Sequence, residues 1–270
     1  MPIEPALIAL LAALGLTSGF LAGLLGIGGG MILVPFISAM LTARGVEPAL
    51  ALKMAIATSM SVIVFTSISS VRAHHKRGAV RWDLVARLTP GIVLGAALAS
   101  LGAFAMLKGA WLGLLFAAFV LFSGTQMLLD KKPAPARHLP GTAALLGAGS
   151  GIGFLSGLVG AGGGFVSVPF MTWCNVPIHH AVATSAALGF PIALANTAGY
   201  IIGGQGLPGL PPGALGYVWL PALLCLASCS VLMAPVGAWA AHALPVKKLK
   251  RVFGLLLYVL GGYMLHKALA

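Results

Sequence analysis

Two glycine-rich stretches in this chain combine residue types that could bind an anion. GFLAGLLGIGGGMILVPF (19–36) and GFLSGLVGAGGGFVSVPF (153–170) are identical at 12 of 18 positions. Three consecutive glycines each cost roughly 1 kcal/mol relative to alanine in a helix, and Pro35 and Pro169 then remove a backbone donor. We expect each stretch to unwind and to expose N–H groups beside the positive end of the next helix, which holds an anion without an arginine. The predicted substrate-binding glycines are Gly28, Gly29, Gly30, Gly162, Gly163 and Gly164.

Close helix packing is the alternative explanation for glycines at a four-residue spacing. The pairs with this spacing are Gly19 with Gly23, Gly26 with Gly30, Gly153 with Gly157 and Gly160 with Gly164. We assign the first and third pairs to packing. The other two pairs contain the triple glycines, for which we predict unwinding because three glycines in a row remove side-chain packing.

Matched hydroxyl residues follow each glycine stretch and could complete an oxyanion site. The alternative is that each Ser or Thr bonds back to its own helix, but their occurrence in both halves of the chain favours a role in binding. Asn196 lies about three turns beyond the second hydroxyl pair, and a buried amide in a membrane must find a polar partner. The predicted polar ligands are Thr58, Ser59, Thr184, Ser185 and Asn196.

Lys53 and His179 occupy matching places, five residues before Thr58 and Thr184. We place them near opposite mouths of a pathway, where each could draw an anion inward. The alternative for Lys53 is that its stem lies along apolar surface while its ammonium reaches the membrane interface. The adjacent histidines 74–75 and 179–180 diverge by about 100° on a helix and have no carboxylate cluster nearby, so we expect no metal site.

Composition places the chain in a membrane. Hydrophobic residues make up 59% of the 270 residues and charged residues 7%, too few to cover a soluble domain of this size. From His138 to Val246 there is no Asp, Glu, Lys or Arg, which leaves room for several spans of about 20 residues. The formal net charge of +12 is concentrated in clusters that border apolar segments, so it indicates membrane topology rather than nucleic-acid binding. We predict an all-α polytopic membrane protein.

The chain is an internal duplication. The two glycine stretches are offset by 134 residues, and AIATS and AVATS follow them in the same order. We predict a first membrane repeat at 1–130, a cytoplasmic linker at 131–140 and a second membrane repeat at 141–270. The predicted apolar segments are 6–26, 30–42, 49–71, 88–107, 110–129, 141–160, 164–174, 181–203, 215–241 and 249–268.

The positive charges indicate that the second repeat is inverted relative to the first. Basic residues cluster in the loop 72–87, but the matching loop at 203–216 has no charge, and the cluster appears one loop later, at 245–251. Because Lys and Arg favour cytoplasmic loops, we place 72–87, 130–140 and 245–251 inside and both termini outside. Inversion requires an odd number of crossings in each half. Three full spans with a re-entrant glycine hairpin satisfy this, and so do five crossings that include a short one.

Acidic residues are too few and too peripheral to couple transport to protons or sodium in the usual way. The four acids, all near segment ends, are Glu4, Glu47, Asp83 and Asp130. An anion that leaves a cell with a negative interior gains about 2.3 kcal/mol per charge per 100 mV, so uncoupled export is energetically sufficient.

These residues resemble the TauE/SafE family of sulfite and organosulfonate transporters over nearly the whole chain. The resemblance lies in the doubled G-x-G-G-G-x4-P motif around Gly28 and Gly162, the ATS helix after each, HHKRGAVRWD at 74–83 and GAWAAHALPVKKLKRVFGLLL at 237–257. It implies a bacterial inner-membrane carrier of sulfite, sulfoacetate or related anions, in most members an exporter. A cysteine-based thiosulfate relay belongs to a more distant branch. The three cysteines, 174, 225 and 229, do not lie on the glycine motifs.

The predicted function is therefore a secondary transporter that exports sulfite or a related small sulfur-containing anion, such as an organosulfonate, and binds it between the two helix breaks. An anion channel is an alternative, because a carrier and a channel can share one anion-binding constriction. The second alternative is a membrane-embedded enzyme that uses the histidines with a metal. We expect no cofactor, and as partners the anion and membrane lipid.

Overall fold

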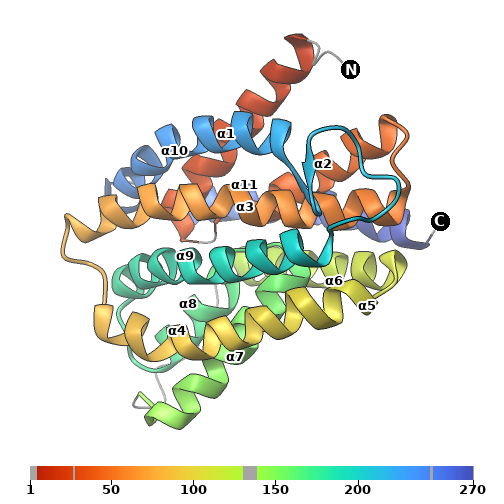
Figure 1. Ribbon diagram of the computed structural model, residues 1–270. Coiled ribbons are helices and arrows are strands. Elements are labelled where there is room, and N and C mark those ends of the chain that lie inside the picture. Colours follow the sequence, from red (N-terminus) through yellow and green to blue (C-terminus); the bar gives the residue numbers. More distant parts are fainter. Residues whose placement is uncertain (1–4, 27, 130–138, 244–245, 270) are drawn as a thin grey trace.

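A computed structural model describes residues 5–26, 28–129, 139–243 and 246–269, and this part is almost entirely helical (Figure 1). The helices are α1 (Pro5–Leu25), α2 (Gly30–Ala43), α3 (Pro48–His75), α4 (Trp82–Ala97), the π-helical turn η1 (Leu98–Ala103), α5 (Phe104–Met106), α6 (Gly109–Leu129), α7 (Thr142–Val159), α8 (Gly164–Trp173), α9 (Ile178–Gly203), α10 (Leu220–Ala243) and α11 (Val246–Leu269). One hairpin of β1 (Ala214–Leu215) and β2 (Val218–Trp219) precedes α10. The predicted all-α class is confirmed.

Eight of the helical segments in the described residues are long and apolar enough to cross a membrane. They are α1, α3, α4 continued through α5, α6, α7, α9, α10 and α11. The helices α2 and α8, of 14 and 10 residues, are shorter. In the described residues each half of the chain therefore contributes four long helices and one short helix. This arrangement fits both predicted alternatives, five crossings that include a short one and three full spans with a re-entrant glycine hairpin, so the number of crossings stays a prediction.

Figure 1 shows α1 and α10 on one side of the bundle, α3 and α9 across its middle, and α4 and α7 on the opposite side. The most extensive pairings join the two halves of the chain: α1 packs on α10, α7 on α4, and α6 on α11. By place in the duplication, α7 corresponds to α1 and α10 to α4. The pairings α1–α10 and α7–α4 are therefore the same contact with the halves exchanged, as a two-fold relation would require.

The matching helices α3 and α9 run antiparallel. The hydroxyl oxygens of Ser61 and Thr197 lie 3.4 Å apart, and a Cβ added to Gly189 would lie 3.5 Å from the Cβ of Ser67. Opposite directions in equivalent helices favour an inverted relation between the halves. The orientation of each half in the membrane stays a prediction.

Glycines let the paired helices approach closely. A Cβ added to Gly19 on α1 would overlap the carbonyl of Ser230 on α10, and one on Gly153 of α7 would overlap the carbonyl of Ile92 on α4. Small residues that bring helix backbones together are the usual means of packing in membranes, where lipid is as apolar as the core. The packing role predicted for these two glycines is confirmed.

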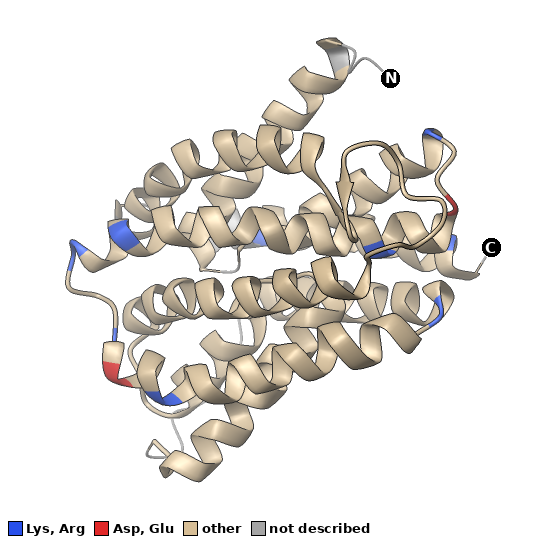
Figure 2. Cartoon of the chain, in the orientation of Figure 1, with Lys and Arg blue, Asp and Glu red and all other residues tan. Residues whose placement is uncertain are grey.

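Most charged residues lie near the ends of the long helices (Figure 2). The end of α3 and the start of α4 carry Arg72, Lys76, Arg77, Arg81, Asp83 and Arg87. The other end, around the start of α3, carries Arg44, Glu47, Lys53, Lys108 and Lys267. Charges at helix ends suit a bundle that spans a membrane. The charged linker 131–138 and the side chains of 246–250 lie outside the described residues, so the predicted orientation is not tested by them.

Alanine at Gly149 should loosen the contact of α7 with α4. An added Cβ there would lie 2.5 Å from the carbonyl of Leu88, and such overpacking costs about 1–3 kcal/mol. We expect Gly149→Ala to lower the unfolding temperature of the full-length protein in detergent, measured by scanning fluorimetry. Gly147→Ala is the matched control, because no described atom lies within 4 Å of its added Cβ. Equal midpoints for the two variants would contradict this packing.

Candidate functional site

Both glycine stretches interrupt the helix, as predicted. The first interruption separates α1 from α2 and the second separates α7 from α8. Within them, the glycines with positive φ are Gly26 (68°), Gly28 (78°), Gly29 (72°), Gly160 (70°) and Gly163 (77°). A residue with a Cβ rarely adopts this left-handed conformation, so glycine is required here by backbone geometry. We call Gly26, Gly28 and Gly29 the first tip, and residues 160–163 the second tip.

The two tips contact each other inside the protein. A Cβ on Gly28 would lie 3.0 Å from the Cα of Gly162, and one on Gly30 would overlap the carbonyl of Gly160. Residues 160–164 are all buried, as are Gly29 and Gly30. Segments 134 residues apart in the sequence thus meet in one place, and side chains at these positions would force them apart.

The helices that follow the tips begin without a side-chain cap. Gly29 and Gly163 precede α2 and α8 in the left-handed conformation, and neither helix start has a side-chain cap on its N–H groups. The one described side-chain bond to the start of α2 goes to a carbonyl, that of Gly30, from the Ser59 hydroxyl at 3.4 Å. The first N–H groups of a helix have no partner within it, and its N-terminus carries about half a positive charge. The acids of the described part lie elsewhere: Glu47 caps α3, and Asp83 pairs with Arg81 at 2.7 Å. Nothing negative in the described chain competes for these two helix ends.

Ser59 and Ser185 each hold the tip of the opposite half. The Ser59 hydroxyl on α3 donates to the carbonyl of Gly160 at 3.1 Å, and the Ser185 hydroxyl on α9 donates to the carbonyl of Gly26 at 3.0 Å. Both serines are fully buried. The structure brings these two predicted residues to the tips, where they satisfy carbonyls that the unwound backbone leaves free. Ser167 on α8, which the sequence did not single out, donates to Ser185 at 2.9 Å.

Thr58 and Thr184 fasten other helices instead of facing the tips. The hydroxyl of Thr58 accepts the backbone N–H of Trp219, directly before α10, at 3.0 Å. The hydroxyl of Thr184 accepts the backbone N–H of Arg81, directly before α4, also at 3.0 Å. Adjacent residues on a helix point about 100° apart, so each threonine faces away from its neighbouring serine. In this conformation the structure does not place these two predicted ligands with the others.

Asn196 is directed to α7 and its own helix. Its Nδ2 donates to the carbonyl of Ile192 at 2.8 Å, and its Oδ1 lies against Gly157. An oxygen acceptor does not attract an anion, so Asn196 does not present a donor to the tips here. Tyr200, one turn later, donates to the Gly157 carbonyl.

Ser156 is a polar group at the second tip that the sequence did not single out. Its hydroxyl is buried and has no hydrogen-bond partner among the described residues. A Cβ on Gly163 would lie 3.3 Å from its oxygen. A buried hydroxyl without a partner is available to a ligand. The one signal in the sequence is that GFLSG in the second stretch replaces GFLAG in the first.

Lys53 is held by a neighbouring helix end. Its ammonium donates to the carbonyl of Ala105 at 3.1 Å and lies 5.8 Å and 6.0 Å from the ring centroids of Phe104 and Tyr217. Burial raises the pKa of the Tyr217 phenol. His179 is exposed at the start of α9. Because α3 and α9 are antiparallel, Lys53 and His179 lie toward opposite ends of the bundle, and their role at pathway mouths stays a prediction.

Long apolar helices, with two short helices that begin at buried and mutually contacting breaks, define a polytopic membrane transport protein of the broken-helix class. The chain belongs to the TauE/SafE family: residues 11–264 match the family described as "Sulfite exporter TauE/SafE". The resemblance drawn from the motifs is confirmed.

The relatives are also named as transporters. A probable membrane transporter protein of Haemophilus influenzae is 35% identical over 255 residues, which cover 94% of this chain and 96% of the relative. The probable membrane transporter protein MJ0441 of Methanocaldococcus jannaschii is 28% identical over 275 residues, with 96% of each chain covered. No solved structure matches the chain significantly. The protein is therefore a membrane transporter rather than an enzyme.

Replacing Thr184 with valine should destabilise the protein. The substitution keeps the shape but leaves the Arg81 amide without its acceptor, which costs about 1–3 kcal/mol. We expect a lower unfolding temperature in detergent for Thr184→Val and a nearly unchanged one for Thr184→Ser. Thr89→Val is the control, since that hydroxyl bonds only to Val85 of its own helix. A midpoint for Thr184→Val equal to that of the control would show that the bond contributes nothing.

Proposed function

We propose that this protein is a secondary transporter that exports sulfite or a related small sulfur-containing anion, such as an organosulfonate, across a bacterial inner membrane. The observation that carries the proposal is the meeting of two tips, each followed by a helix with an uncapped N-terminus. The family description, sulfite exporter, supports the substrate class.

The proposed site has the donors that an oxyanion needs. Backbone N–H groups at the starts of α2 and α8 face a substrate with several acceptor oxygens, and the two helix ends together supply about one positive charge. Ser156 adds a hydroxyl that has no other partner among the described residues. No arginine or lysine takes part, so the anion is attracted without the strong ion pair that would slow its release. Binding that is favourable but weak is what a transport site requires.

The contact between the tips supplies a way to couple binding to movement. An anion between α2 and α8 requires the tips to separate, because the Gly160 carbonyl now lies against Gly30. Separation breaks the hydrogen bonds of Ser59 to Gly160 and of Ser185 to Gly26. The two hydroxyls then donate to the anion instead of to a carbonyl. In this scheme the closed tips are the empty state, and the anion and the carbonyls compete for the same donors.

Flux through the purified protein in liposomes tests the substrate and the mode of transport. We expect sulfite or an organosulfonate such as sulfoacetate to be carried in preference to sulfate. The flux should saturate with concentration and be stimulated by the same anion on the opposite side, as for a carrier. Imposing the membrane potential and the pH gradient separately shows which one drives it. Flux that does not saturate would instead identify an anion channel, and its absence for every sulfur anion tested would contradict the substrate class.

Alanine at Gly28 should impair transport more than an equally strained alanine elsewhere. Gly28 has φ of 78° and faces the second tip, whereas Gly45 has φ of 84° and no described atom within 4 Å of an added Cβ. Both substitutions place a side chain in a left-handed conformation, at about 1–2 kcal/mol. We expect at least a tenfold loss of sulfite flux for Gly28→Ala and little change for Gly45→Ala, with both variants monodisperse in detergent. Equal flux in the two would remove the tips from the transport mechanism.

A further inference from the structure

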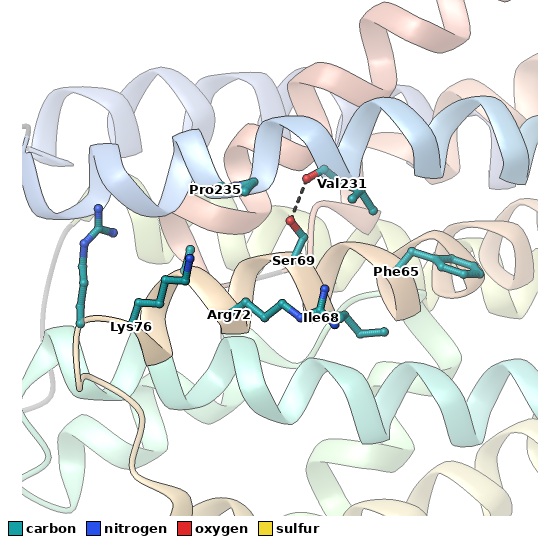
Figure 3. Close-up of a pocket in the computed structure, with 9 residues that line it drawn as sticks. Phe65, Ile68, Ser69, Arg72, Lys76, Val231 and Pro235 are labelled. Carbon is teal, nitrogen blue, oxygen red and sulfur yellow. Dashed lines mark hydrogen bonds between the residues drawn. The ribbon is translucent and has the colours of Figure 1, made fainter.

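A groove between α3 and α10 carries a basic end and an apolar wall (Figure 3). Its volume is about 510 Å³, within the usual range for ligand sites of about 300–1,000 Å³. Phe65 and Ile68 lie along the apolar part, and Arg72 and Lys76 toward the other end, with Pro235 across from Arg72. None of the tip residues lines the groove, and the proposed transport function does not use it.

The two walls are fixed to each other by a defined hydrogen bond. Pro235 has no N–H, so the carbonyl of Val231, four residues earlier on α10, has no intrahelical donor. Ser69 on α3 donates to that carbonyl at 2.8 Å, as Figure 3 shows. Arg77 makes a second link through its bond to the carbonyl of Ala238 at 2.9 Å. The groove is thus a built feature and not a gap between loosely packed helices.

The basic end has a net positive charge that nothing in the described chain neutralises. The side chains of Arg72 and Lys76 make no hydrogen bond or ion pair with another described residue, and Asp83 is already paired with Arg81. The bonds from Ser69 and Arg77 show that α3 and α10 run parallel, so both C-termini lie at this end. Their dipoles contribute about one negative charge together, against three positive charges from Arg72, Lys76 and Arg77. About two positive charges remain.

The apolar wall faces the surroundings at the depth of acyl chains. Phe65 lies on a membrane-spanning helix, about 10 Å along its axis from Arg72, and is 48% exposed. On α10, Leu232, next in sequence to the lining residue Val231, and Trp239, one turn beyond Pro235, are 73% and 56% exposed. In a membrane protein, large apolar side chains that are exposed in this way contact lipid. A small anion would fill only the basic end and leave this wall uncovered.

We propose that this groove binds an anionic phospholipid. Its phosphate lies between Arg72 and Lys76, and one acyl chain runs along Ile68 and Phe65. Basic pockets between membrane helices are suited to anionic headgroups, since each cation attracts the lipid and the low dielectric nearby strengthens the attraction. The occupant is a structural lipid and not the transported anion.

Native mass spectrometry of the full-length protein in nonionic detergent tests this assignment. Phosphatidylglycerol is titrated against phosphatidylcholine at fixed ionic strength. We expect one phosphatidylglycerol to bind tightly, and Arg72→Gln with Lys76→Gln to weaken it about thirtyfold, from the loss of two charges. Arg87→Gln with Lys108→Gln is the charge-matched control, since neither residue lines the groove, and should bind as the unaltered protein does.

A second variant and a second ligand make the outcome decisive. Ile68→Trp fills the apolar part without changing the charge and should also weaken phosphatidylglycerol at least tenfold. Inorganic phosphate should not raise the unfolding temperature at concentrations where the lipid does. Equal binding of the two lipids, or unchanged binding by the glutamine pair, would overturn the proposal. Full competition by phosphate would show a site for a free anion instead.

Discussion

Inside a membrane every main-chain polar group needs a partner, and the two broken helices are the places where this requirement is hardest to meet. The structure meets this requirement for the carbonyl groups but not for the N–H groups. Carbonyls freed at the tips accept from Ser59 and Ser185, each supplied by the opposite half, while the N–H groups at the starts of α2 and α8 receive no side-chain cap from the described residues. Had the carbonyls been free and the amides capped, the same break would suit a cation. This inequality favours an anion over a cation and supports the proposed site.

The hydrogen bonds and packing contacts that position the candidate site run between the two halves of the chain and not within one half. Thr58 and Thr184 each bind the start of a helix from the other half, and α1 and α7 each pack against a helix from the other half. The result is two groups of helices, α1 with α3 and α10, and α7 with α9 and α4. Their shared boundary is the α3–α9 contact, where small residues such as Ser61 and Gly189 meet the opposite helix. A relative shift of the two groups at this boundary would separate the tips, whereas the groove between α3 and α10 lies within one group.

The sequence predicted those features of the fold that depend on short stretches of residues. Hydropathy located the membrane helices, and the triple glycines located both breaks, because the length of an apolar segment and the strain of a backbone turn depend on residues that are close in sequence. The exception is 215–219, expected within an apolar helix, where a hairpin forms after a loop rich in glycine and proline. Sequence could not assign Thr58 and Thr184, since their partners lie over 100 residues away. Ser156 and Ser167 differ from their counterparts in the first stretch, and only the fold shows that these differences face the tips.

The pairing of α1 with α10 has a consequence for biogenesis. As the chain leaves the ribosome, α1 enters the bilayer with its glycine face uncovered, and its partner begins about 200 residues later. At roughly 5–20 residues per second, that interval is about 10–40 s. During this time the glycine face of α1 can be occupied only by lipid, by the insertion machinery or by a helix other than α10. The last helices to be synthesised therefore complete the packing of the first, and a chain released early would keep that surface open to other proteins in the membrane.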